Sequence, residues 1–276
     1  MVWIRRELDA LHIPPLKRFG QHFLVDASVR DELVQQAGLR DNDTVLEVGP
    51  GLGFLTSALT KKAGRVIAVE KDRTLAAHLK EKFSGSKNVT IVQGDALTTS
   101  IPDDAKIVSS PPYNISSKLI IMILSSRFKA ATLLLQEEFA ERLTALSGSR
   151  DYGRLTVMLQ CKAQAKLINK VPRSAFYPRP RVDSAIVNIE PLKETPTIEN
   201  SEIFAELVRM LFTQRRRKLE GVLNRYLSRG YPSQAKEILN STRVPEKRVF
   251  ETSPEEFVAL SNQITEVLSK LKVRQD

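Results

Sequence analysis

A short loop of the sequence carries the residue types needed for chemistry on an amine. Ser110-Pro111-Pro112-Tyr113 continues from the apolar run at 106–110. Proline fixes φ and lacks a backbone N–H, so two consecutive prolines favour a rigid loop over a helix or a central strand. Backbone carbonyls and the Ser110 hydroxyl can accept hydrogen bonds from an exocyclic –NH2, and Tyr113 can stack on the base that carries it. We predict that the loop holds such a base; the alternative is a turn with Tyr113 buried.

A glycine-containing stretch, "EVGPGLG", ends an earlier apolar run and precedes a helical pattern. Glycines allow a tight turn and a close approach of the backbone to a ligand. A dinucleotide fingerprint requires a third glycine at the position of Phe54, which excludes a nicotinamide dehydrogenase. The spacing of Glu47, Gly49, Gly51 and Gly53 instead resembles the loop of S-adenosylmethionine-dependent methyltransferases, in which a carboxylate meets the methionine ammonium. The alternative is a tight strand–helix turn.

Two further carboxylates stand at the ends of the next apolar runs. Glu70 ends "RVIAVE", 17 residues after Gly53, and Asp95 lies in "QGDA". Glu70 is placed to accept hydrogen bonds from ribose hydroxyls, and Asp95 from an adenine amino group. Each carboxylate alone could equally be a helix N-cap or a surface residue. Together they predict the ligand crevice of an open α/β sheet, because the carboxyl ends of parallel strands meet at one edge.

The elements that must position these residues are short apolar runs separated by helical patterns. Continuous apolar runs are typical of strands buried on both faces of a parallel sheet. Their alternation with helices predicts a doubly wound α/β fold. The predicted strands are 44–49, 65–70, 89–95, 106–110 and 131–136, with helices such as 72–83 and 116–128 between them.

The pattern changes after residue 160. Polar and apolar residues alternate over 162–168, which predicts a strand with one exposed, basic face, and 182–191 is a further strand. A polar segment with two prolines, 191–200, is a plausible linker. We therefore predict an α/β domain over 1–191 and an all-helical domain over 200–276. The helical patterns of the second domain are 201–212, 215–227, 232–240 and 253–271.

Composition restricts the class of protein. With 42% hydrophobic and 27% charged residues, the 276-residue chain is typical of a globular protein. No apolar run approaches the roughly 20 residues that span a bilayer, and the N-terminus lacks the apolar core of a signal peptide. The single cysteine, Cys161, excludes an internal disulfide, and three histidines beside it leave no cysteine-rich zinc site. We expect a cytoplasmic protein without metal or membrane partner.

Positive charge is concentrated in two segments. The formal net charge is +10, and between Arg142 and Arg181 nine basic residues face one acid, Asp151, which gives 9 − 1 = +8 within 40 residues. A second cluster occupies 215–218. Concentrated positive charge favours a polyanionic partner. The alternative is the solvated surface of a basic protein.

These motifs together resemble the KsgA/Dim1 family of small-subunit ribosomal RNA adenine dimethyltransferases. The resemblance runs nearly end to end: "KRFGQHFLVD", "EVGPGLGFLT", "VEKD", "QGDA", "LLLQEEFAERL", "YGRLTVMLQ", "FYPRPRVDSAIV" and "LFTQRRRKL" follow in the family's order. His22 replaces a common Asn in the first of these. In the catalytic loop, Ser110 and Pro111 stand where the family usually has Asn and Leu.

The resemblance implies a Rossmann-like class I methyltransferase domain with a mostly parallel seven-stranded sheet, plus a small all-helical C-terminal domain. It implies two methyl transfers from S-adenosylmethionine to N6 of each of two adjacent adenosines, in a 3'-terminal hairpin loop of small-subunit rRNA. The partner is then the assembling small subunit. We expect the protein itself to be a monomer.

The motifs, the resemblance and the basic segments together give three sets of residues. The catalytic set holds the target base, with Phe176 stacking opposite Tyr113: Ser110, Pro111, Pro112, Tyr113 and Phe176. The cofactor set is Gln21, His22, Leu24, Glu47, Gly49, Gly51, Gly53, Glu70, Lys71, Asp95, Ala96 and Ser110. The basic segments supply the RNA-binding set, Arg142, Arg150, Arg154, Lys162, Lys166, Arg179, Arg181, Arg215, Arg216, Arg217 and Lys218.

Two alternatives remain at the level of sequence. One is a related methyltransferase acting on large-subunit rRNA or on DNA, against which the C-terminal helical segment argues. The other is a ribosome-assembly or transcription factor that keeps the fold without catalysis. Ser110 favours the second, since its hydroxyl offers less than an Asn amide; Glu70, Asp95 and the glycine loop argue against it. Without the resemblance, Phe176 is better explained as a core residue.

Overall fold

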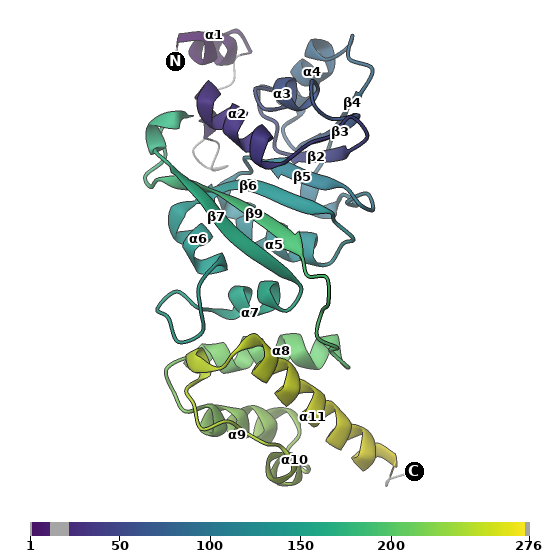
Figure 1. Ribbon diagram of the computed structural model, residues 1–276, viewed down its shortest axis with the longest axis vertical. Coiled ribbons are helices and arrows are strands. Elements are labelled where there is room, and N and C mark those ends of the chain that lie inside the picture. The colour runs from purple at the N-terminus through teal and green to yellow at the C-terminus, as the bar shows by residue number, and fades with distance from the viewer. Residues whose placement is uncertain (1, 12–21, 274–276) are drawn as a thin grey trace. The chain divides into compact units, whose positions relative to one another are not determined.

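The computed structural model describes residues 2–11 and 22–273 and forms two compact units (Figure 1). The first, here called the sheet unit, comprises residues up to Glu141 together with Ala163–Pro191. The second, the helical unit, comprises Arg142–Lys162 and residues from Leu192 onward. The chain therefore leaves the sheet unit, contributes to the helical unit and returns before its final crossing.

This division differs from the predicted boundary, which placed 142–162 in the first domain. Tyr152, Val157 and Cys161 are buried in the core of the helical unit. The Tyr152 hydroxyl donates a hydrogen bond to the Thr252 carbonyl, over 2.9 Å. Linear sequence patterns do not reveal such an excursion, because these apolar side chains would suit a core in either unit.

The sheet unit is built on seven strands in the order β4-β3-β2-β5-β6-β9-β7. The first five are mutually parallel, and β9 runs antiparallel to both β6 and β7. This topology confirms the predicted, mostly parallel seven-stranded sheet. The strands are β2 (Thr44–Val48), β3 (Arg65–Glu70), β4 (Val89–Gln93), β5 (Lys106–Ser109), β6 (Ala130–Gln136), β7 (Ala163–Val171) and β9 (Ser184–Pro191).

Helices cover the sheet because its strands are apolar on both faces. On one face, Val45, Val108 and Leu134 share a buried cluster with apolar side chains of α2 (Ala27–Gln36) and α3 (Thr56–Leu59). Alternate strand residues point to the opposite face. The remaining helices of this unit are α4 (Arg73–Lys82), α5 (Ser116–Leu124) and the first part of α6 (Glu137–Leu143).

A separate two-stranded sheet joins the N-terminal segment to the region before β9. Strand β1 (Phe23–Leu24) pairs antiparallel with β8 (Phe176–Tyr177). Helix α1 (Val2–Ala10) precedes it and buries Ile4 and Leu8 against Phe23, Leu52 and Leu75. Because strands of two residues carry no periodic signal, sequence analysis did not predict this pairing.

The helical unit has its own apolar core, which includes Phe204, Leu223 and Phe257. The four helices predicted here are confirmed, although α9 begins at Leu219 rather than at 215. Arg215–Lys218 precede the helix and follow a short 3-10 turn at Phe212–Gln214. The helices are α7 (Arg154–Gln160), α8 (Ser201–Leu211), α9 (Leu219–Gly230), α10 (Ala235–Ser241) and α11 (Pro254–Val273).

Candidate active site at the carboxyl edge of the sheet

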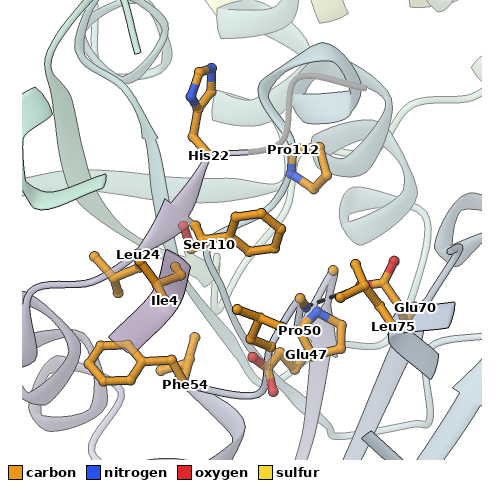
Figure 2. A pocket seen from close by; sticks show the side chains of 15 residues that line it. Ile4, His22, Leu24, Glu47, Pro50, Phe54, Glu70, Leu75, Ser110 and Pro112 are labelled. Atoms are coloured by element: carbon orange, nitrogen blue, oxygen red, sulfur yellow. Dashed lines mark hydrogen bonds between the residues drawn. The ribbon is translucent and has the colours of Figure 1, made fainter. Parts of the chain in front are cut away.

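A pocket opens at the carboxyl ends of β2, β3 and β5 (Figure 2). This is the switch point of the sheet, because the chain passes from β2 to β3 on one side and reaches β5 on the other. The predicted residues that line it are His22, Leu24, Glu47, Gly49, Gly51, Glu70, Ser110 and Pro112. Sequence analysis thus located the pocket, and its motifs meet there from four separate segments.

The glycine loop brings the end of β2 against the predicted catalytic loop. Gly49 and Gly51 have φ of +69° and +59°, which glycine adopts readily and other residues do not. A Cβ at Gly49 would lie 3.0 Å from Cδ of Pro112, and one at Gly51 would lie 2.9 Å from Cδ1 of Phe23. Gly53 packs instead toward α4 and does not line the pocket.

The two buried carboxylates of the pocket differ in their partners. Glu47 is 1% exposed, and within the described part of the chain its Oε2 has no hydrogen-bond partner. Burial raises the pKa of Glu47 to about 8. Glu70 accepts hydrogen bonds from the backbone N–H groups of Gly51 (3.1 Å, drawn in Figure 2) and Asp72 (2.9 Å). Burial also raises the pKa of Glu70.

Asp95 does not line the pocket, and neither do Lys71 and Ala96. The Asp95 carboxylate binds the Lys71 ammonium at 2.9 Å and caps the turn at Ala96–Thr98 through the Leu97 N–H. The hydrogen bond from Lys71 holds the pKa of Asp95 below its usual value. The geometry thus matches the N-cap role that the sequence left open, and the adenine contact of Asp95 stays a prediction. Gln21 lies outside the described residues.

The Ser-Pro-Pro-Tyr loop is anchored by the residue before it. Ser109 donates a hydrogen bond from Oγ to the Val48 carbonyl over 2.6 Å, which ties the end of β5 to β2. Ser110 and Pro112 line the pocket, whereas Pro111 is buried. Sequence analysis missed Ser109; the doubled serine in "SSPPY" was the available signal.

Tyr113 is fixed by three side chains from distant segments. Its hydroxyl forms a 2.6 Å hydrogen bond with Oγ of Ser184. Its ring meets Phe176 edge-on, with centroids 6.3 Å apart, and lies 5.6 Å from the tilted ring of His22. His22 and Phe176, two of the predicted site residues, therefore contact this tyrosine. Burial raises the pKa of the Tyr113 phenol to about 12, so it stays protonated at neutral pH.

Phe176 occupies the core rather than an open face. It is 2% exposed and packs with Leu24, Val171 and Ile186. This matches the alternative that the sequence left open for Phe176, and its stacking on a base stays a prediction. His22 is held by the β1–β8 pairing: its Nδ1 lies 2.7 Å from the Pro178 carbonyl, so Nδ1 carries the hydrogen. In Figure 2 its ring points away from the other labelled side chains.

The predicted RNA-binding residues belong to both units. All are exposed except Arg215, which is half-buried. Arg215 donates to the carbonyls of Ser149 (3.2 Å) and Arg150 (2.8 Å) and lies over the Phe250 ring. Arg215 thus holds the loop before α7. The sheet unit contains Lys166, Arg179 and Arg181; the helical unit contains Arg142, Arg150, Arg154, Lys162 and Arg215–Lys218.

Across residues 2–11 and 22–273, no helix combines the length and apolar character that crossing a bilayer requires. The same residues hold no group of three or more His, Cys, Asp or Glu side chains placed to bind a metal ion.

Comparison with known families decides the class of this site. Residues 16–266 match the family model described as ribosomal RNA adenine dimethylase. The chain belongs to this family. Among adenine-dimethylase relatives, a probable ribosomal RNA small subunit methyltransferase A of Thermococcus onnurineus is 43% identical over 242 residues, 86% of this chain and 88% of the relative. A protein of the same description from Pyrococcus abyssi is 39% identical over 94% and 95% of the two chains.

Solved structures agree with this assignment. A dimethyladenosine transferase from Plasmodium falciparum aligns with a TM-score of 0.80 and 29% identity, covering 89% of this chain and 98% of that one. The 23S rRNA methyltransferase ErmE aligns with a TM-score of 0.65 and 32% identity, over 88% and 99%. The expected family and class I methyltransferase fold are confirmed, and the protein is an rRNA adenine dimethyltransferase.

Proposed function

We propose that this dimethyltransferase transfers two methyl groups from S-adenosylmethionine to N6 of each of two adjacent adenosines, in a 3'-terminal hairpin loop of small-subunit rRNA. The observation that carries the proposal is one pocket lined by the glycine loop, Glu47 and Glu70 on one side and by Ser110 and Pro112 on the other. Relatives described as small-subunit enzymes support this substrate. The enzyme meets assembling subunits in the cytoplasm.

The residues of the pocket fit the methyl donor. Glu47 offers a buried carboxylate oxygen without a described partner, which suits the ammonium of a methionine group. Because Gly49 and Gly51 lack a Cβ, Pro112 and Phe23 can pack closely against the glycine loop where all four residues line the pocket. Glu70 fixes the loop through the Gly51 N–H and keeps acceptor capacity for ribose hydroxyls. S-adenosylmethionine, when bound, supplies an activated methyl group on a sulfonium sulfur.

The catalytic loop positions the acceptor. The Ser110 hydroxyl and the loop carbonyls accept hydrogen bonds from the N6 amine and direct its lone pair toward the methyl group, while Tyr113 stacks on the base. Because the attack is direct and in line, catalysis comes from orientation and from the exclusion of water. The amine forms the new C–N bond as the methyl group leaves the sulfur, and the amine's surplus proton passes to solvent. Removing the base from its stack costs least in a loop.

The first experiment uses labelled S-adenosylmethionine with undermodified small subunits and, separately, with large subunits, followed by mass spectrometry of the digested RNA. We expect dimethyladenosine in one small-subunit loop. Product in large-subunit rRNA would instead indicate a substrate of the class named for the 23S rRNA methyltransferase ErmE, which is 32% identical. No methylation despite measurable binding of cofactor and subunits would indicate a non-catalytic assembly factor. A Tyr113→Ala variant serves as the matched inactive control.

Substitution of Ser110 by Asn tests the loop itself. Asn adds an amide carbonyl acceptor where Ser has a hydroxyl, and the loss of one such hydrogen bond in a transition state costs up to about 10²–10³ in rate. We expect Ser110→Asn to change the rate and to raise the ratio of dimethyl to monomethyl product, measured by the same mass spectrometry. An unchanged rate and ratio would show that Ser110 does not contact the amine.

A further inference from the structure

Ser184 lies in an interior strand of the main sheet and has no role in the function proposed above. It is the first residue of β9, which is flanked by β6 and β7. Its backbone stands opposite Gln136 on one side and Val171 on the other. The residue is fully buried. Ser184 is therefore a fixed point, because strands on both sides hold its backbone.

The Ser184 hydroxyl forms a hydrogen bond with Tyr113 of the catalytic loop. Its Oγ lies 2.6 Å from the Tyr113 hydroxyl oxygen, a strong hydrogen bond between groups 71 residues apart in sequence. Either oxygen can donate, since the Tyr113 phenol stays protonated. The bond is largely shielded from water, because Ser184 is buried and Tyr113 half-buried.

The bond to Ser184 holds the hydroxyl end of the Tyr113 side chain, which the main chain does not fix. The main chain of Tyr113 is set by the turn at Tyr113–Ile115 that follows the two prolines. Phe176 and His22 contact its ring, but such aromatic contacts tolerate sliding and rotation. Among the contacts that Tyr113 makes with the described residues, the bond to Ser184 fixes the position of the distal oxygen. The long axis of the ring is thus held at both ends, by the turn at the main chain and by Ser184 at the hydroxyl.

We propose that Ser184 is a positioning residue that acts through Tyr113, holding the long axis of the ring in the position that receives the target base. This inference rests on the proposed function, in which Tyr113 stacks on the adenine. A base that is held out of line reacts more slowly, because a misplacement of about 1 Å can cost about 100-fold in rate. Ser184 is not one of the described residues that line the pocket.

The test is a cycle of three variants, Ser184→Ala, Tyr113→Phe and the double variant, with small subunits as substrate. We expect each single variant to lower kcat at least tenfold, with the Kd for S-adenosylmethionine unchanged. The double variant should be no slower than the slower single one, because both substitutions remove the same bond. Ser261→Ala is the matched control: Ser261 is a buried serine of the helical unit whose hydroxyl has no partner within the described residues.

Three results would overturn the proposal. The first is a wild-type kcat in Ser184→Ala. The second is a double variant whose loss equals the product of the single losses, since Ser184 would then act elsewhere. The third is weaker cofactor binding in step with kcat, which is the signature of a general structural defect. If Ser184→Ala does not fold, Tyr113→Phe decides alone, and a wild-type kcat there refutes the proposal. Absence of methylation by the wild-type enzyme refutes the proposed function instead.

Discussion

Glu47 shows how one buried side chain can link cofactor binding to pH. Its pKa of about 8 means that the carboxyl group is protonated in the free enzyme at neutral pH. An ammonium beside Oε2 would favour the ionised form, because a nearby opposite charge lowers the pKa of an acid. Binding of S-adenosylmethionine must then displace the proton. Below about pH 8 the free energy needed to ionise Glu47 lowers the affinity for the cofactor, and above about pH 8 this cost disappears.

We therefore predict that cofactor binding releases up to one proton per site below about pH 8, and that affinity rises with pH until that value is reached. Calorimetry in two buffers of different ionisation enthalpy measures the release directly. In Glu47→Gln the residue cannot ionise, so any proton exchange that remains belongs to the cofactor's own amino group, which takes up a proton when it binds as the ammonium. Equal proton release by the variant and the wild type would contradict the assignment of Glu47.

At the scale of elements, the N-terminal helix α1 contributes to the pocket of the sheet unit. Ile4 of α1 lines the pocket beside Phe23. Glu7 ties α1 to α4 through His78 (3.1 Å) and Lys82 (3.2 Å). We infer that α1 forms a wall of the occupied site.

Ile4→Ala is accordingly expected to weaken S-adenosylmethionine binding about tenfold, mainly through faster dissociation, because the ligand loses apolar contact area. Stopped-flow measurement of the association and dissociation rates tests this. Leu8→Ala is the matched control, since Leu8 is buried in the same cluster but does not line the pocket. Equal weakening by the two variants would show that docking of α1, and not contact at Ile4, matters.

The elements also show what sequence patterns can and cannot predict. The apolar runs predicted five strands of the main sheet, and the pattern after residue 160 predicted the other two. The motif residues Glu47, Gly49, Glu70 and Ser110 line the pocket. The β1–β8 pair was missed because it is two residues long, and with it the contacts of Ile4. The bond of Tyr113 to Ser184 joins segments 71 residues apart, which no local pattern encodes.

On the scale of the whole molecule, positive charge is spread over both units. The segment of +8 is divided between them, because 142–162 belongs to the helical unit and 163–181 to the sheet unit. Basic residues are not equivalent within it. Lys170 forms ion pairs with Glu137 and Glu141, whereas Arg179 and Arg181 are exposed and form no ion pair within the described part of the chain. Only charge that is not already paired releases counterions fully when it meets phosphate.

This distinction gives a prediction about salt. If Arg179 and Arg181 contact RNA phosphates, the double variant Arg179→Ala/Arg181→Ala should weaken subunit binding and reduce the slope of log Kd against log salt by about 1–2, since each lost phosphate contact removes about 0.7–0.9. Lys170→Ala removes an exposed charge of the same unit that is already paired, so its slope should stay near that of the wild type. Filter binding between about 50 and 200 mM salt covers the range in which such slopes are measured. An unchanged slope in the double variant would mean that these arginines form a solvated surface and that the RNA is bound elsewhere on the molecule. An equal change in Lys170→Ala would mean instead that pairing with Glu137 and Glu141 does not keep Lys170 from the phosphates.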